Sequence, residues 1–294
     1  AEGVSSGLKR GWLTFFCQWV TCLLTIGGFC HAWGWGVGFK TFVLLASLPL
    51  FLQHIIIGIA VARVTRTRFY LFCWNRFDNG AVSGVVRQGF GFLVPQAAAV
   101  FITNVPALFL SAVLGPAAVT PYKLCQQMGN ALMMLQALPI NPLWPAYAEA
   151  KSRGDWRWIR KMFRISLLYC TFSGLVVGAG IWLLGEWVVK IWTRGMVPEL
   201  PPGLLPGFGL WLLLQAVIGA PNIFLNGIGK LRKQAIGAAC CAVCFIIAAP
   251  FAIRQWGVPA PVFCLTFQTL LFSGTLMCWD TILIFRNHAI IRGR

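Results

Sequence analysis

A lysine and two glutamines lie close together within a long apolar stretch of this chain. Lys123 and Gln127 are four residues apart, so a helix would place them on one face, with Gln126 beside them. A lysine at mid-membrane costs roughly 2.5–3.5 kcal/mol, which demands a wet cavity or a partner. Such a group could bind an anionic, hydroxyl-rich ligand. The alternative is that Lys123, close to a helix end, extends its charge to water.

Further amide side chains interrupt two other apolar stretches. Gln96 and Asn104 lie in the stretch that precedes Lys123, and Gln215, Asn222 and Asn226 follow one another along a later stretch. At helical spacing, either set could line a polar cavity. Hydrogen bonding between neighbouring helices is the alternative for every one of these residues.

Carboxylates and histidines are too few and too scattered to indicate an enzyme. Catalysis of acyl, glycosyl or phosphoryl transfer needs a positioned base or metal-binding carboxylates. Glu149 and Asp155 share a segment with basic residues that would neutralise them. Asp280 lies inside an apolar stretch, where it could couple transport to a cation, as acids do in drug exporters, or equally pair with polar backbone or water. We therefore expect no catalytic residue in this chain.

Metal and cofactor chemistry is not expected either. Most of the 11 cysteines fall in apolar stretches, where cysteine acts as a small hydrophobe. Cys240, Cys241 and Cys244 are close in sequence, but no histidine or carboxylate is near enough to complete a metal site. The chain also has no glycine-rich phosphate loop before a soluble helix, so the sequence predicts no ATP-driven activity.

The segment 145–164 combines basic and aromatic residues. Asp155 is placed to cap a helix after Gly154, which would put Trp156 and Trp158 at the level of lipid headgroups. The basic side chains of this segment would then face lipid phosphates or water: Arg157, Arg160, Lys161 and Arg164. An interfacial anchor is the simpler interpretation. The alternative is a direct role in gathering a phosphate-bearing lipid substrate.

Composition requires that these residues be positioned by membrane helices. Apolar residues make up 58% of the chain and charged residues only 11%, which is too little polar surface for a soluble globule of 294 residues. Apolar stretches of about 20 residues, the length that crosses a bilayer as a helix, recur along the chain. The sequence predicts an all-α bundle of about eight transmembrane helices: Gly11–Trp33, Phe39–Val61, Gln88–Leu114, Val119–Leu143, Ile165–Leu184, Leu204–Gly227, Ile236–Trp256 and Val262–Phe285.

Prolines and glycines inside these stretches fit helix packing in a bundle. Neighbouring helices can satisfy the carbonyl groups that proline frees; the prolines concerned are Pro49, Pro95, Pro106, Pro139, Pro221 and Pro250. The pairs Gly174/Gly178 and Gly203/Gly207 have the spacing that lets helix backbones approach closely. We expect packing to be their only role.

Lysine and arginine concentrate in alternate loops, which predicts the topology. The segments around residues 9–10, 63–87, 151–164, 230–233 and 286–294 hold most of them, so the positive-inside rule places both termini of this chain in the cytoplasm. The net charge of +17 then reflects this asymmetry and attraction to anionic membrane lipids. No segment could form a basic soluble domain, so a nucleic-acid partner is not expected.

Four segments resemble bacterial polysaccharide flippases, the exporters of O-antigen and exopolysaccharide units. They are LGPAAVTPY at 114–122, PLWPAYAEA at 142–150, RGDW at 153–156 and FLNGIGKLRKQA at 224–235. The resemblance implies a two-lobed fold of the multidrug and oligosaccharidyl-lipid exporter superfamily, located in the inner membrane. Residues 1–75 would hold the last two helices of the first lobe, whose earlier helices are missing, and residues 76–294 the whole second lobe.

The same resemblance implies a function and a site. Such proteins carry undecaprenyl-diphosphate-linked oligosaccharides outward by alternating access, in lipopolysaccharide or exopolysaccharide biosynthesis, beside polysaccharide-assembly membrane proteins. The expected substrate-binding residues are Lys123, Gln126, Gln127, Gln96, Asn104, Gln215, Asn222 and Asn226. Asn104 is neutral where family members often have an acid, which weakens any inference of ion coupling there. A polymerase or transferase of polysaccharide assembly and a multidrug-type exporter are the alternatives.

Overall fold

A computed structural model describes residues 79–197 and 199–290, together with a few isolated positions before residue 60. The chain divides into two compact units, 1–78 and 79–294. The predicted spans Gly11–Trp33 and Phe39–Val61 lie largely outside the described residues. The lobe boundary expected after residue 75 depends on the resemblance and stays a prediction.

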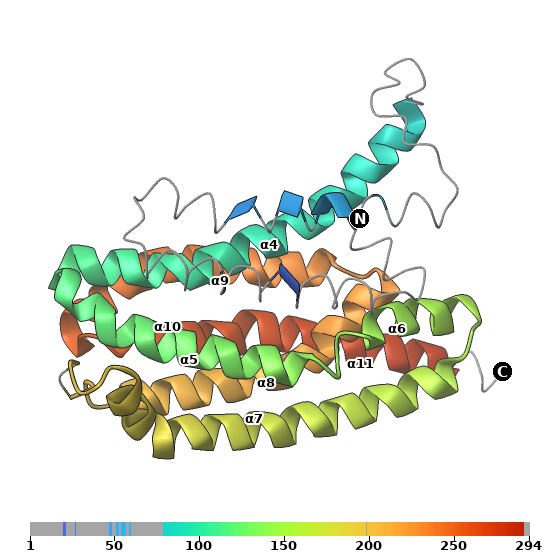
Figure 1. Ribbon diagram of the computed structural model, residues 1–294. Helices are drawn as coiled ribbons and strands as arrows, with labels where there is room; N and C mark the ends of the chain where they lie inside the picture. Colours follow the sequence, from blue (N-terminus) through green and yellow to red (C-terminus); the bar gives the residue numbers. More distant parts are fainter. Residues whose placement is uncertain are drawn as a thin grey trace. The chain divides into compact units, whose positions relative to one another are not determined.

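Every element between residues 79 and 290 is helical (Figure 1). In chain order they are α4 (Asn79–Leu114), η2 (Pro116–Ala118), α5 (Val119–Ala137), α6 (Leu143–Ser152), α7 (Trp156–Trp192), α8 (Leu204–Ile228), α9 (Arg232–Trp256), α10 (Ala260–Gln268), η3 (Thr269–Gly274) and α11 (Thr275–Ile290). The prediction of an all-α polytopic membrane bundle is confirmed.

Within the described residues, five segments are long and apolar enough to cross a membrane. They are Gln96–Leu114, Trp156–Trp192, Leu204–Ile228, Arg232–Trp256 and Ala260–His288. Each contains most or all of a predicted span. Helix α5 is not among them because it carries Lys123 and several amide side chains, yet it packs beside the apolar α7 and α8. It is thus a polar helix within an apolar bundle.

The distribution of apolar side chains fits a lipid environment. Large apolar residues along α7, such as Leu168, Phe172 and Leu183, are exposed, as a lipid-facing surface requires. Other aromatic side chains are buried in the interior. Tyr122, Phe208 and Phe245 are buried in a cluster near the start of α5 and α8. A second cluster surrounds Tyr147 and Phe224 at the other end of α8.

Glycines let α7 and α8 pack with their backbones in close approach. A β-carbon on Gly174 would lie 2.6 Å from the β-carbon of Ala216, and one on Gly178 would lie 2.6 Å from the carbonyl oxygen of Gly209. Only glycine fits at such distances. Gly174 and Gly178 therefore serve close helix packing, as their spacing predicts.

Prolines affect the helices differently. Pro221 and Pro250 lie inside α8 and α9, and α4 continues through Pro106. The prediction that the span beginning at Val119 reaches Leu143 is wrong, because α5 ends at Ala137 and Pro139 lies in the turn before α6. A proline cannot donate the hydrogen bond that the next helical turn needs. The last span is continuous from Ala260 to Ile290 but contains the π-helical segment Thr269–Gly274.

Most basic residues of this unit gather at one end of the bundle, here named the basic end. It comprises α6, the first turns of α7 and α9, and the last turns of α8 and α11, which lie together on one side of Figure 1. Lys151 links two of these elements, since its Nζ donates to the carbonyl oxygen of Ile228 at 2.7 Å. The charge asymmetry read from the loops thus has a structural counterpart.

Candidate functional site

Lys123 is the centre of a hydrogen-bonded group between α4 and α5. Its Nζ donates to Gln126 Oε1 at 2.8 Å and to the carbonyl oxygen of Thr103 at 3.1 Å. Gln126 Nε2 donates to the same carbonyl oxygen at 3.1 Å. Gln126 is buried and Lys123 half-buried. Within the described part of the chain, the cation has hydrogen-bond partners but no carboxylate among them. Sequence spacing could not reveal Thr103 as the partner, because the contact is made by its backbone on another helix.

A groove of about 540 Å³ runs beside this group. It is formed by the last turns of α4, by η2 and by the first turns of α5, and Lys123 and Gln127 both line it, as their four-residue spacing predicts. Ser111 and Thr120 add hydroxyl groups to a lining that is otherwise apolar. The groove therefore offers one cation with amide and hydroxyl groups to a ligand.

Two other predicted residues on α4 lie apart from this groove. Asn104 is exposed, and its Nδ2 donates to the carbonyl oxygen of Val100 at 2.9 Å on its own helix. Gln96 is exposed two turns earlier on α4. Neither residue lines the groove. The structure therefore does not join them to Lys123.

A second polar group connects α8 with α9 at the basic end. Asn222 Oδ1 accepts hydrogen bonds from Asn226 Nδ2 at 3.0 Å and from Gln234 Nε2 at 2.6 Å. The sequence alone assigns no role to Gln234, because residues that pair across two helices have no fixed spacing along the chain. The buried Asn226 Oδ1 and Gln234 Oε1 have no hydrogen-bond partner among the described residues. This group has the form of the interhelical hydrogen bonding considered above.

The two polar groups lie at different ends of the bundle. Tyr122, next to Lys123, packs on Phe208 with ring centroids 5.2 Å apart, and Asn222 follows Phe208 on the same helix about 20 Å further along the axis. Gln215 is half-buried between them, about 10 Å from Asn222. The predicted site residues therefore form two separate groups and several single positions, and their role in substrate binding stays a prediction.

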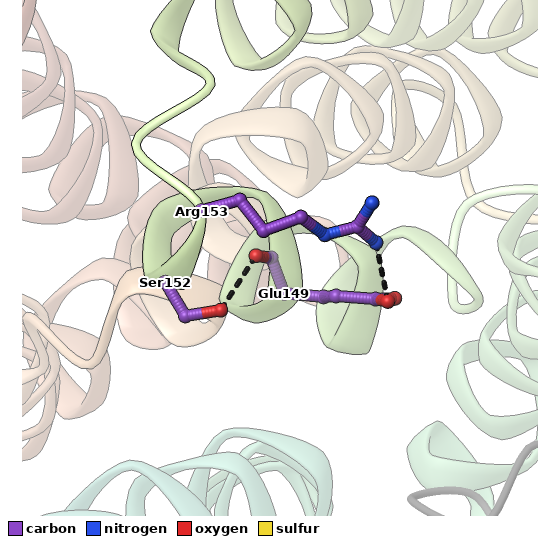
Figure 2. Close-up of polar contacts among 3 residues, drawn as sticks. All are labelled: Glu149, Ser152 and Arg153. Carbon is purple, nitrogen blue, oxygen red and sulfur yellow. Dashed lines mark hydrogen bonds and ion pairs between the residues drawn. The ribbon is translucent and has the colours of Figure 1, made fainter.

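The acidic residues of the basic end each have a polar partner, a cation for two of them and a backbone N–H for the third. Glu149 forms an ion pair with Arg153 one turn further along α6, and its carbonyl oxygen accepts from Ser152 Oγ at 2.8 Å (Figure 2). Asp155 caps α7 as predicted, its Oδ1 accepting from the backbone N–H of Trp158 at 3.0 Å. Asp280 contacts Lys233, with 2.8 Å between Oδ1 and Nζ. Each carboxylate thus has a structural partner.

Metal ligation has no support in the part of the chain that the structure describes. There, no group of three or more histidine, cysteine, aspartate or glutamate residues could hold a metal ion. Cys241 instead lies against the π-helical segment, with its Sγ 3.2 Å from the carbonyl oxygen of Gln268. The described cysteines behave as packing residues.

Comparison with known proteins gives one distant similarity. The chain is 24% identical over 166 residues to a protein of Yersinia pseudotuberculosis named "Putative O-antigen export protein". The alignment covers 55% of this chain and 37% of that protein. No family model matches the chain. No solved structure matches it.

Proposed function

We propose that this protein is a membrane transporter of polysaccharide biosynthesis, a flippase that moves undecaprenyl-diphosphate-linked oligosaccharide outward across the inner membrane. The distant similarity to the Yersinia protein supports a role in O-antigen export. The four sequence segments that resemble polysaccharide flippases point to the same class. The membrane bundle supplies a scaffold of the required kind.

The observation that carries the proposal is the Lys123 group beside its groove. A diphosphate and a glycan can cross hydrocarbon only where cations, amides and hydroxyls replace water. Helix α5 brings such groups into the bundle: Lys123, Gln126 and Gln127 lie together, and the first and last of them line the groove. A scaffold that only anchored other proteins would not need a cation there.

The proposed mechanism is alternating access. The basic end collects the diphosphate from the cytoplasmic leaflet, the glycan enters a polar cavity, and the polyprenyl tail stays in lipid through a gap between helices. Rocking of two repeats against each other then exposes the cavity to the other side. Both lobes are needed for this motion, and we infer that the described unit is the second lobe.

The test is deletion of the gene in its own host, with the lipid-linked glycan located by probes that do not cross the inner membrane. Loss of a flippase removes surface polysaccharide and leaves lipid-linked oligosaccharide accessible only from the cytoplasmic side. Loss of a polymerase would instead leave single repeat units at the surface. Loss of a multidrug-type exporter would raise drug sensitivity with normal polysaccharide. Either of these two results would contradict the proposal.

A further inference from the structure

A pocket of about 540 Å³ lies at the basic end, away from the Lys123 groove. Its lining includes four cationic side chains from the first turns of α7, together with Trp156 and His288. The cations are Arg157, Arg160, Lys161 and Arg164. Among the described residues, no acidic side chain lines it. Four cations so close together repel one another, and an anion in the pocket would relieve that repulsion.

The end of α11 builds the second wall of this pocket. The ring of His288 stacks on Trp156 with centroids 3.5 Å apart, and the guanidinium carbon of Arg160 lies 5.8 Å from the centroid of the Phe285 ring. His288 Nδ1 lies 2.8 Å from the carbonyl oxygen of Ile284, which can only accept, so Nδ1 donates. Two distant segments of the chain thus fix the pocket, whereas a solvated basic face would need only one helix.

An apolar stripe continues from the pocket along α7. Lys161 is followed by Ile165, Leu168 and Phe172 at spacings of four, three and four residues, which places all of them on one face of the helix. The three apolar side chains are 48%, 71% and 70% exposed. Cations at the end of a membrane helix and exposed apolar side chains below them match the two parts of a lipid.

We propose that this pocket binds the phosphate headgroup of an anionic glycerophospholipid, with its acyl chain along Ile165, Leu168 and Phe172. The stripe argues against free phosphate, which has no apolar part. The stripe is exposed along α7, which favours a bilayer lipid over the transported one, because the glycan of the transported lipid needs polar surroundings. The bound lipid would hold α7 and α11 together at the basic end.

Lipid titration of the purified full-length protein, followed by native mass spectrometry, tests this proposal. The probes are phosphatidylglycerol, phosphatidylcholine and undecaprenyl phosphate. We compare the wild type with the double variant Arg157→Gln/Lys161→Gln. The matched control is Lys230→Gln/Arg232→Gln, which removes the same charge from exposed positions at the same end but outside the pocket. Thermal unfolding checks that both variants remain folded.

The wild type should bind phosphatidylglycerol more tightly than phosphatidylcholine. In the pocket variant, the affinity for phosphatidylglycerol should fall by about tenfold or more, and in the control variant by about twofold or less. Equal losses in the two variants, or no loss in either, would overturn the proposal. Pocket-dependent binding of undecaprenyl phosphate in preference to phosphatidylglycerol would also overturn it. Because the assay measures lipid binding alone, failure of the flippase hypothesis would not change its result.

Discussion

Lys233 Nζ and Asp280 Oδ1 lie 2.8 Å apart and connect the first turn of α9 to α11. The Asp280 side chain is 12% exposed and that of Lys233 35% exposed, so the carboxylate is the more deeply buried partner. Gln234, the next residue on α9, donates to Asn222 on α8. The start of α9 is therefore joined by polar contacts to two other helices at the basic end.

Replacing Lys233 should destabilise the protein more than replacing Asp280 does. Lys233→Gln leaves a largely buried carboxylate without its cation, so we expect it to lower the free energy of unfolding by about 1–3 kcal/mol. Asp280→Asn should cost less, because Lys233 can turn to water. Thermal unfolding in detergent measures both changes. In the double variant the loss should be smaller than the sum of the single losses, and simple additivity would show that the pair is not coupled.

Replacing Lys123 should impair export if the groove binds the diphosphate. Lys123→Ala removes a charge-assisted contact worth about 1.5–3 kcal/mol, so the export rate should fall by about tenfold or more. Lys123→Arg keeps the charge and should retain more of the rate. The measurement is surface polysaccharide per amount of protein in the membrane. Lys190→Ala is the matched control, since this exposed lysine pairs with Glu186 on its own helix. Normal polysaccharide in Lys123→Ala would remove Lys123 from the mechanism.

Gly178 and Gly180 should respond oppositely to the same substitution. A β-carbon on Gly178 would lie 2.6 Å from the carbonyl oxygen of Gly209, so Gly178→Ala should destabilise the protein by about 1–3 kcal/mol. A β-carbon on Gly180 would meet no heavy atom of the described residues within 4 Å, so Gly180→Ala should be neutral or stabilise by up to about 1 kcal/mol. Thermal unfolding of the two variants side by side decides this, and equal melting temperatures would contradict the packing of α7 on α8.

We expect the cap of α7 to depend on the acceptor oxygen of Asp155 and not on its charge. Asp155→Ala removes the acceptor for the N–H of Trp158, so we expect a loss of about 1 kcal/mol and faster amide hydrogen exchange in the first turn of α7. Asp155→Asn keeps an acceptor oxygen and should behave nearly as the wild type. A similar loss in both variants would mean that the charge itself stabilises this basic segment.

The sequence predicted the elements of the bundle well, because apolar length and capping chemistry are local properties. The apolar stretches from Leu204 and Ile236 correspond to α8 and α9, and Asp155 caps α7 as its type and position indicate. The error at the end of α5 is also local, since Pro139 stops that helix before Leu143. Spacing alone placed Lys123 and Gln127 on one face of the same helix.

The partners of the polar residues were decided by the tertiary structure. No periodicity could show that Lys123 donates to the backbone of Thr103, that Gln234 completes the Asn222 group, or that His288 stacks on Trp156. These contacts join helices whose rotation and depth are set by packing across many residues at once, as where Gly178 meets Gly209. The sequence by itself determined a helical membrane bundle with an uneven charge distribution, and the packing of its helices decided which polar groups meet.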